Sequence, residues 1–172
     1  EILKEIAINS EKSDIRLDII NKVDDDELLN YIALNDSDSV VRSEAVKKIT
    51  DDETLLKVIE NDKDPFVRQI AVKNLNNTQE LIKIALNDDD QYVRAHAISN
   101  PAITDEADFT YVAINSTYED VAAEAMEHIT DEKNFIEILK NAKLENIRKS
   151  TLDNITDLET LIRIVLANED EE

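Results

Sequence analysis

The chain has 172 residues, and its 40 acidic residues against 19 basic ones give a formal net charge of −21. Because proteins bind nucleic acid largely by neutralising phosphates with Lys and Arg, this charge argues against a nucleic-acid partner. The sequence has no cysteine and no glycine, which excludes disulfides, thiolate metal sites and glycine-rich phosphate loops. No apolar run approaches the ~20 residues of a membrane-spanning helix and no signal-like segment is found, so we expect a cytoplasmic protein without a membrane partner.

One 26-residue pattern is repeated along the chain. Its clearest copies are NDSDSVVRSEA, NDKDPFVRQIA and NDDDQYVRAHA, and the full set begins at Asn9, Asn35, Asn61, Asn87, Asn115 and Asn141. The step from the fourth copy to the fifth is 28 residues, which we attribute to a two-residue insertion around Pro101. The predicted repeats are therefore 9–34, 35–60, 61–86, 87–114, 115–140 and 141–166, preceded by a partial repeat at 1–8.

Each copy is predicted to contain two short amphipathic helices, because its apolar residues recur at spacings of three and four. In the second copy we expect them at about 38–49 and 52–60. Asp38, Asp64 and Asp90 occupy N-cap positions, and Pro65 follows at the first helical position, where its missing N–H costs nothing. With no glycine available, Asn, Asp and Thr must make the turns.

Helices of about ten residues are marginal alone and become stable by stacking on their neighbours. The uninterrupted register predicts a single all-α domain over residues 1–172, built as an α-solenoid of about six two-helix repeats. The sequence opens and closes in mid-repeat and lacks an initiator Met, so we expect a fragment or processed product.

The pattern N/D-x-x-D-x-x-V-R-x-x-A resembles short HEAT-like repeats, and its 26-residue length is closer to the leucine-rich variant repeat. The stretch AISNPAITDEADFTYVAIN (97–115) is similar to the Asn-Pro turn of that variant. The resemblance implies a right-handed superhelix of helix pairs, one of each pair α or 3-10, and it implies no common activity. Unlike the variants with an iron–sulfur cluster, this chain has no cysteine ligands.

An arginine recurs at one position of the pattern, as Arg16, Arg42, Arg68, Arg94 and Arg148. These guanidinium groups could form a row that binds phosphates or an acidic tail, since Arg suits bidentate oxyanion recognition. Alternatively, each Arg pairs with Asp or Asn side chains in the inter-helix turns and ties neighbouring repeats together. The resemblance to HEAT-like repeats favours this second, structural interpretation.

No catalytic, metal or cofactor site is predicted. The chain has two histidines, His96 and His128, too few for the paired His-Glu sites of the HEAT-like di-iron hydroxylases. Glu124 lies one helical turn before His128 and could supply a second ligand, but surface pairing explains the spacing better. The acidic runs at 24–27 and 88–90 lack EF-hand spacing and are better explained as helix capping.

The candidate partner-binding surface lies on the helix of each repeat that carries the repeated arginine, on the arc opposite its apolar columns. In the middle copies this arc carries apolar and aromatic side chains, with acidic residues in the flanking copies; the candidate residues are Val40, Phe66, Ile70, Tyr92, His96, Asp120 and Glu124. By resemblance to HEAT-like solenoids, this row lines the concave face. The alternative, which we favour for Phe66 and Tyr92, is that both lean on the neighbouring repeat as part of the core.

We therefore expect a monomeric, non-enzymatic protein-interaction scaffold with an acidic concave groove. Its charge favours a basic protein partner, although the same charge could serve only to keep the chain soluble. The alternative function is an accessory repeat domain of a larger enzyme, as in bilin lyases, with the active residues outside this chain. A purely structural spacer is a third hypothesis.

Overall fold

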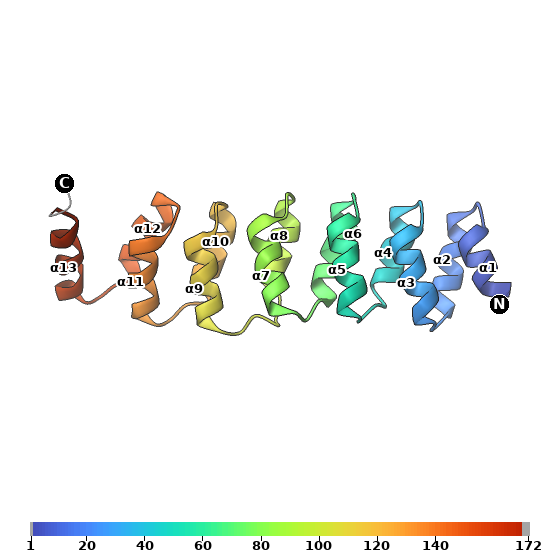
Figure 1. Ribbon diagram of the computed structural model, residues 1–172, viewed down its shortest axis with the longest axis horizontal. Helices are drawn as coiled ribbons and strands as arrows, with labels where there is room; N and C mark the ends of the chain where they lie inside the picture. The colour runs from blue at the N-terminus through green and yellow to red at the C-terminus, as the bar shows by residue number, and fades with distance from the viewer. Residues whose placement is uncertain (1, 170–172) are drawn as a thin grey trace. The chain divides into compact units, whose positions relative to one another are not determined.

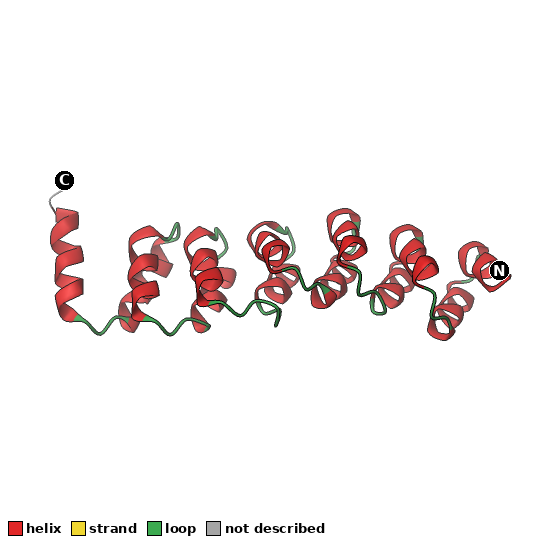
Figure 2. Cartoon of the chain, turned by 60° about the horizontal axis from the view of Figure 1, so that its bottom comes forward, coloured by secondary structure: helices red, strands yellow, loops and turns green. Residues whose placement is uncertain are grey.

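The computed structural model describes residues 2–169, and these residues form thirteen α-helices and one short 3-10 helix, with no strand among them. Consecutive helices pack against each other in antiparallel pairs joined by short loops (Figure 1; Figure 2). The predicted all-α class is confirmed. Most helices have eight to ten residues, a length at which packing against neighbours, and not intrinsic propensity, provides the stability.

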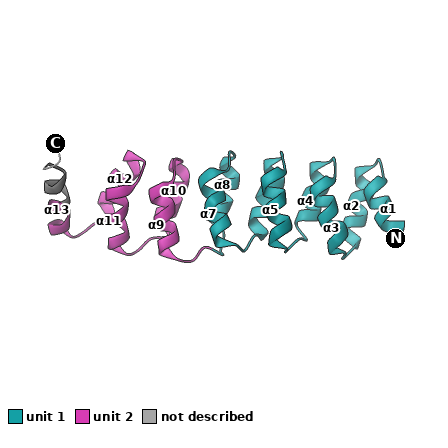
Figure 3. Cartoon of the chain, viewed as in Figure 1, with its two compact units in different colours: residues 1–102 teal, residues 103–172 magenta. Residues whose placement is uncertain are grey.

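The chain divides into two compact units, residues 1–102 and 103–172 (Figure 3). Unit 1 contains α1 (Ile2–Asn9), α2 (Ser13–Lys22), α3 (Asp26–Asn35), α4 (Ser39–Val46), α5 (Asp52–Asn61), α6 (Pro65–Asn74), α7 (Thr78–Asn87) and α8 (Gln91–Ile98). Unit 2 contains α9 (Glu106–Asn115), α10 (Glu119–Glu127), α11 (Glu132–Asn141), α12 (Glu145–Thr151), η1 (Leu152–Asn154) and α13 (Leu158–Glu169).

The division falls at the insertion seen in the sequence. Asn100 keeps the 26-residue spacing from Asn74, whereas the next N-cap, Asp105, is 28 residues after Asn77. The two extra residues therefore lie between Asn100 and Asp105. Odd-numbered helices are called first helices below, and even-numbered ones second helices.

Most helices begin at a capping side chain, and in unit 1 these caps recur every thirteen residues. The side chains that accept a backbone N–H of the first turn there are Asp25, Asp38, Asp51, Asp64, Asn77 and Asp90. The predicted caps are confirmed, and Pro65 is the first residue of α6. Each cap satisfies a donor that a helix start otherwise leaves without an intrahelical partner. The Thr54 hydroxyl and N–H together lower the pKa of Asp51.

Helix ends are closed without glycine and without a single positive φ among the described residues. At the first helices, an asparagine folds back so that its Nδ2 donates to the carbonyl four residues earlier; these residues are Asn9, Asn35, Asn61, Asn87 and Asn115. The repeated Asn that marks the start of each copy is thus the C-terminal residue of a first helix. Its side chain gives the i−4 carbonyl a second donor beside the backbone N–H of the Asn itself.

At the second helices, the carbonyls of the last turn accept hydrogen bonds from the following repeat. Asn74 Nδ2 donates to the carbonyls of Val46 and Ile49 at 3.0 and 3.1 Å. One repeat later, Asn100 Nδ2 donates to the carbonyls of Val72 and Leu75 at 2.8 and 3.1 Å, at a buried position. Side chains of the following repeat therefore help to satisfy the carbonyls at the ends of α4 and α6.

Helix α4 is shorter than predicted. In the second copy α4 ends at Val46, and not near Ile49, because Lys48 and Ile49 donate to carbonyls only three residues back. Both helices of each described pair are α-helices, and the 3-10 geometry is limited to η1. The core is formed by the apolar columns of the repeat, with Val41, Val67 and Val93 fully buried.

Candidate functional site

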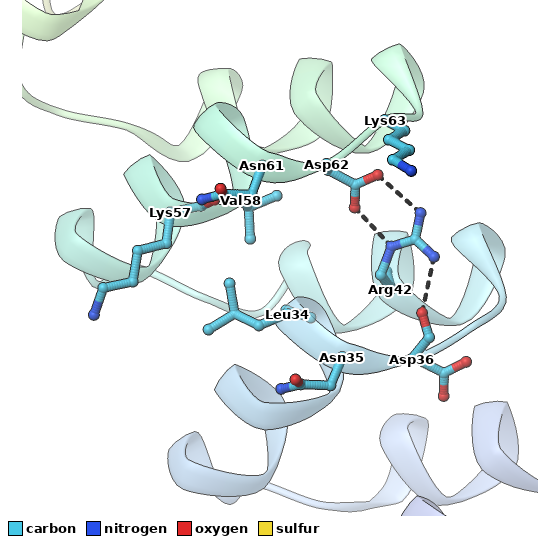
Figure 4. Close-up of a pocket in the computed structure, with 10 residues that line it drawn as sticks. Leu34, Asn35, Asp36, Arg42, Lys57, Val58, Asn61, Asp62 and Lys63 are labelled. Carbon is cyan, nitrogen blue, oxygen red and sulfur yellow. Dashed lines mark hydrogen bonds and ion pairs between the residues drawn. The ribbon is translucent and has the colours of Figure 1, made fainter.

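The repeated arginine joins one repeat to the next in unit 1. Arg42 donates from Nε and Nη2 to the two carboxylate oxygens of Asp62, at 2.6 and 2.8 Å (Figure 4). The same bidentate contact, always across twenty residues, joins Arg16 to Asp36 and Arg68 to Asp88. The side chains are largely buried, and the hydrogen bond that each guanidinium donates to its carboxylate raises the pKa of that guanidinium.

The remaining guanidinium nitrogen, Nη1, also donates a hydrogen bond. Nη1 of Arg42 donates to the carbonyl of Asp36, which lies in the turn just before its own helix. Arg16, Arg68 and Arg148 make the equivalent contact six residues back. For these arginines in unit 1, the interpretation that Arg pairs with Asp to tie neighbouring repeats together is confirmed. The guanidinium donors are used within the chain and are not presented to a phosphate or an acidic tail.

Between the fifth and sixth repeats, in unit 2, neither partner of this ion pair is present. Ala122 occupies the arginine position and Ala142, twenty residues later, occupies the aspartate position; both are buried. Replacing both partners of a buried ion pair with apolar groups avoids leaving an uncompensated charge. The junction is instead held by Lys143, whose N–H and Nζ donate to the carbonyls of Ile114 and Asn115.

A second set of contacts between repeats starts from the residue that follows the first-helix N-cap. The carboxylate of Glu106 accepts from the Thr130 hydroxyl at 2.5 Å, the Asp131 N–H at 3.1 Å and Asn134 Nδ2 at 3.0 Å. The Thr130 hydrogen bond and these other donors lower the pKa of Glu106 to about 2. Glu132 receives the equivalent donors from Thr156 and Asp157.

Pockets open between neighbouring first helices. One of about 250 Å³ lies between α3 and α5, with Leu34, Asn35, Lys57, Asn61 and Lys63 among its lining residues and the Arg42–Asp62 pair at its side (Figure 4). Similar spaces of about 400 Å³ lie beside Tyr31 in unit 1 and beside Tyr111 in unit 2. These pockets were not predicted from the sequence; the recurrence of Asn at first-helix ends was the available signal, since Asn lines all three.

The second helices carry a row of exposed apolar residues in unit 1. Val40, Phe66 and Tyr92 are 55, 55 and 58% exposed, and each is the second residue after its N-cap aspartate. They occupy the same position in three successive repeats, 26 residues apart. We call these three residues the second-helix row.

Two predictions about this row are wrong. Phe66 and Tyr92 do not lean into the core, because both are more than half exposed. Ile70, which was expected to continue the strip, is only 8% exposed. The reason is that α6 packs against α4 on one side and α8 on the other, which leaves a narrower exposed arc than a single helix would have.

The remaining predicted site residues are distributed over both units. His96 lies partly exposed next to Tyr92 on α8, where its Nδ1 is 2.6 Å from the Tyr92 carbonyl and must donate, since a carbonyl only accepts. Asp120 and Glu124 are exposed on α10 of unit 2. The structure therefore groups Val40, Phe66, Tyr92 and His96 on one unit, and no site that joins them to the two acidic residues is described.

Glu124 and His128 form the predicted surface pair, with Oε1 and Nε2 3.6 Å apart. The His128 ring is also stacked on Phe109, with centroids 4.4 Å apart. No group of three potential metal-ligating side chains comes together within the described part of the chain. Among the same residues, no helix combines the length and apolar character that crossing a membrane requires.

No family model, no curated protein and no solved structure matches this chain.

Proposed function

We propose that the chain is a non-enzymatic protein-interaction scaffold of the HEAT-like or leucine-rich variant type, and that it binds its partner on the second-helix row. The observation that carries the proposal is the exposure of Val40, Phe66 and Tyr92 at one position of three successive repeats. Buried polar groups elsewhere hold the repeats together, whereas the row is a periodic feature that makes no such contact between repeats. Exposed aromatic side chains with a polar rim are characteristic of binding hot spots.

Packing in unit 1 supports this choice of face. Neighbouring second helices α4, α6 and α8 pack against each other more extensively than the first helices do, and the pockets open between the first helices. An array bends toward the side on which its helices pack more closely, which favours the second helices as the inner, concave row. A concave face allows a partner to contact several repeats at once.

The test compares capture of proteins from the source cell by the full chain and by two variants. We expect Tyr92→Ala to lose the captured partner, whereas Tyr31→Ala, which removes an exposed tyrosine from α3 beside a first-helix pocket, retains it. Both variants must keep the wild-type circular dichroism. Loss with Tyr31→Ala alone would assign the function to the first-helix face.

A further inference from the structure

We infer that the second-helix row binds an extended peptide in the polyproline II conformation, with an apolar residue at every third position. This inference rests on the proposed function and adds the conformation and side-chain spacing of the partner. It follows from three features of unit 1: the repeat distance, the width of the row and the charges beside it.

The repeat distance matches the pitch of a polyproline II helix. Because α4 packs directly on α6 and α6 on α8, successive members of the row are separated by roughly one interaxial distance, about 8–10 Å. A polyproline II segment rises about 3.1 Å per residue with three residues per turn, so it presents the same face every ~9.3 Å. Three successive turns therefore place three equivalent side chains over Val40, Phe66 and Tyr92.

Other backbone conformations fit the row less well. A β-strand presents the same face every two residues, about 6.7 Å, and loses register by ~2–3 Å with each repeat. An α-helix returns to the same face after seven residues, about 10.5 Å, and its docking surface needs a wide apolar strip for positions i, i+3, i+4 and i+7. The row is a single side chain wide.

Its narrowness is set by the residues one helical turn further along each second helix. At this position Ile70 is buried, and Glu44 and His96 are polar. A polyproline II helix contacts an aromatic surface through one edge and keeps its unpaired backbone groups hydrated, so it needs no wider strip.

Charge beside the row favours cations between the apolar residues of the peptide. The N-cap carboxylates Asp38, Asp64 and Asp90 lie two residues before the row members, one in each repeat. In each, Oδ1 accepts the N–H of the row residue two positions later. Asp90 Oδ1 also accepts the Val93 N–H, and Asp64 also has a hydrogen bond with the Ser39 side chain. The row is therefore accompanied by one carboxylate per repeat, on a chain whose net charge is −21, and such a field attracts basic ligands.

The test uses fluorescently labelled peptides built from leucine–proline–lysine triplets, with binding to the full chain measured by fluorescence anisotropy. We expect the affinity to increase with each of the first three triplets and to increase little with a fourth, because the row has three members. A peptide of the same composition with leucines in adjacent pairs has the same charge and should bind at least tenfold more weakly. A helical peptide with leucine at every seventh position should also bind at least tenfold more weakly.

Variants of the chain locate the binding site. Phe66→Ala and Tyr92→Ala should each weaken binding of the three-triplet peptide at least tenfold, and Tyr31→Ala should leave it within twofold. Equal binding of the paired-leucine or helical peptide, still dependent on Tyr92, would overturn the polyproline II inference and leave the interaction surface in place. Binding that no row variant alters, together with unchanged partner capture by Tyr92→Ala, would overturn both.

Discussion

Arg42 and Asp62 lie twenty residues apart in the sequence and form a bidentate ion pair, with Nε–Oδ2 and Nη2–Oδ1 distances of 2.6 and 2.8 Å. The side chains are 15 and 5% exposed. Because the two residues belong to successive repeats, the pair exists only when both repeats are folded and stacked. It thereby couples neighbouring repeats, as do the hydrogen bonds of Asn74 to the Val46 and Ile49 carbonyls.

Removing the carboxylate of this pair should destabilise unit 1 strongly. Asp62→Ala leaves the guanidinium of Arg42 without its charged partner, and breaking a buried pair in this way costs about 3 kcal/mol of unfolding free energy. Urea denaturation followed by circular dichroism measures the loss. Asp89→Ala is the control, because the Asp89 side chain contacts Arg68 but is 91% exposed, and exposed pairs contribute at most ~1 kcal/mol. Equal effects of the two substitutions would contradict the ion-pair argument.

A charge placed in the valine column should unfold the repeats around it. Val67 is fully buried, so Val67→Asp introduces an unpaired charge that costs several kcal/mol. We expect most of the helical signal of unit 1 to be lost in circular dichroism. Val40→Asp makes the same change at an exposed position in the first turn of α4, where negative charge is favourable, and should melt like wild type. An unchanged melt of Val67→Asp would show that the repeat register is wrong.

Asn100 allows a test of whether a side chain from the neighbouring repeat stabilises the C-terminal end of α6. Asn100→Ala removes the donor to the carbonyls of Val72 and Leu75 at a position that is 5% exposed. The Val72 carbonyl keeps the Leu75 N–H, whereas the Leu75 carbonyl loses its side-chain donor. A buried carbonyl left without a partner costs about 1–3 kcal/mol, so the free energy of unfolding should fall by that amount. Asn76→Ala, at an exposed position, should change it by less than ~0.5 kcal/mol. If both variants unfold at the same urea concentration, Asn100 does not close α6.

Acid should weaken unit 2 through Glu106. Its pKa is about 2 in the folded chain against an ordinary value of 4.5, so the unfolded chain binds the proton more readily. The stabilisation is therefore fully present above about pH 4.5 and is lost as the pH falls toward 2. Glu106→Gln should lower Tm at pH 7, and the difference from wild type should shrink between pH 4.5 and 2. Glu137→Gln, at an exposed position of α11, is the control; a pH-independent difference for Glu106→Gln would contradict the prediction.

The local structure follows from the sequence because its causes are local or periodic. Capping requires an Asp or Asn within three residues of the N–H it satisfies, so Asp38, Asp64 and Asp90 could be recognised from spacing alone. The apolar columns are periodic, and burial of Val41, Val67 and Val93 follows from their position in the repeat. The resemblance to HEAT-like repeats remains a prediction, as do the handedness of the solenoid and the nature of the partner.

Tertiary structure decided which groups meet across repeats. The spacing of Asn74 and Asn100 was visible in the sequence, but their role depends on where the preceding helix ends, three residues earlier than predicted for α4. Packing between neighbouring repeats also decided which side chains of the second helices are exposed. Phe66 and Ile70 are one helical turn apart and looked equivalent on an isolated helix, yet packing of α6 between α4 and α8 exposes the first and buries the second. The sequence by itself determined the period, the helix starts and the core columns, while the width of the exposed arc depended on how closely neighbouring helices pack.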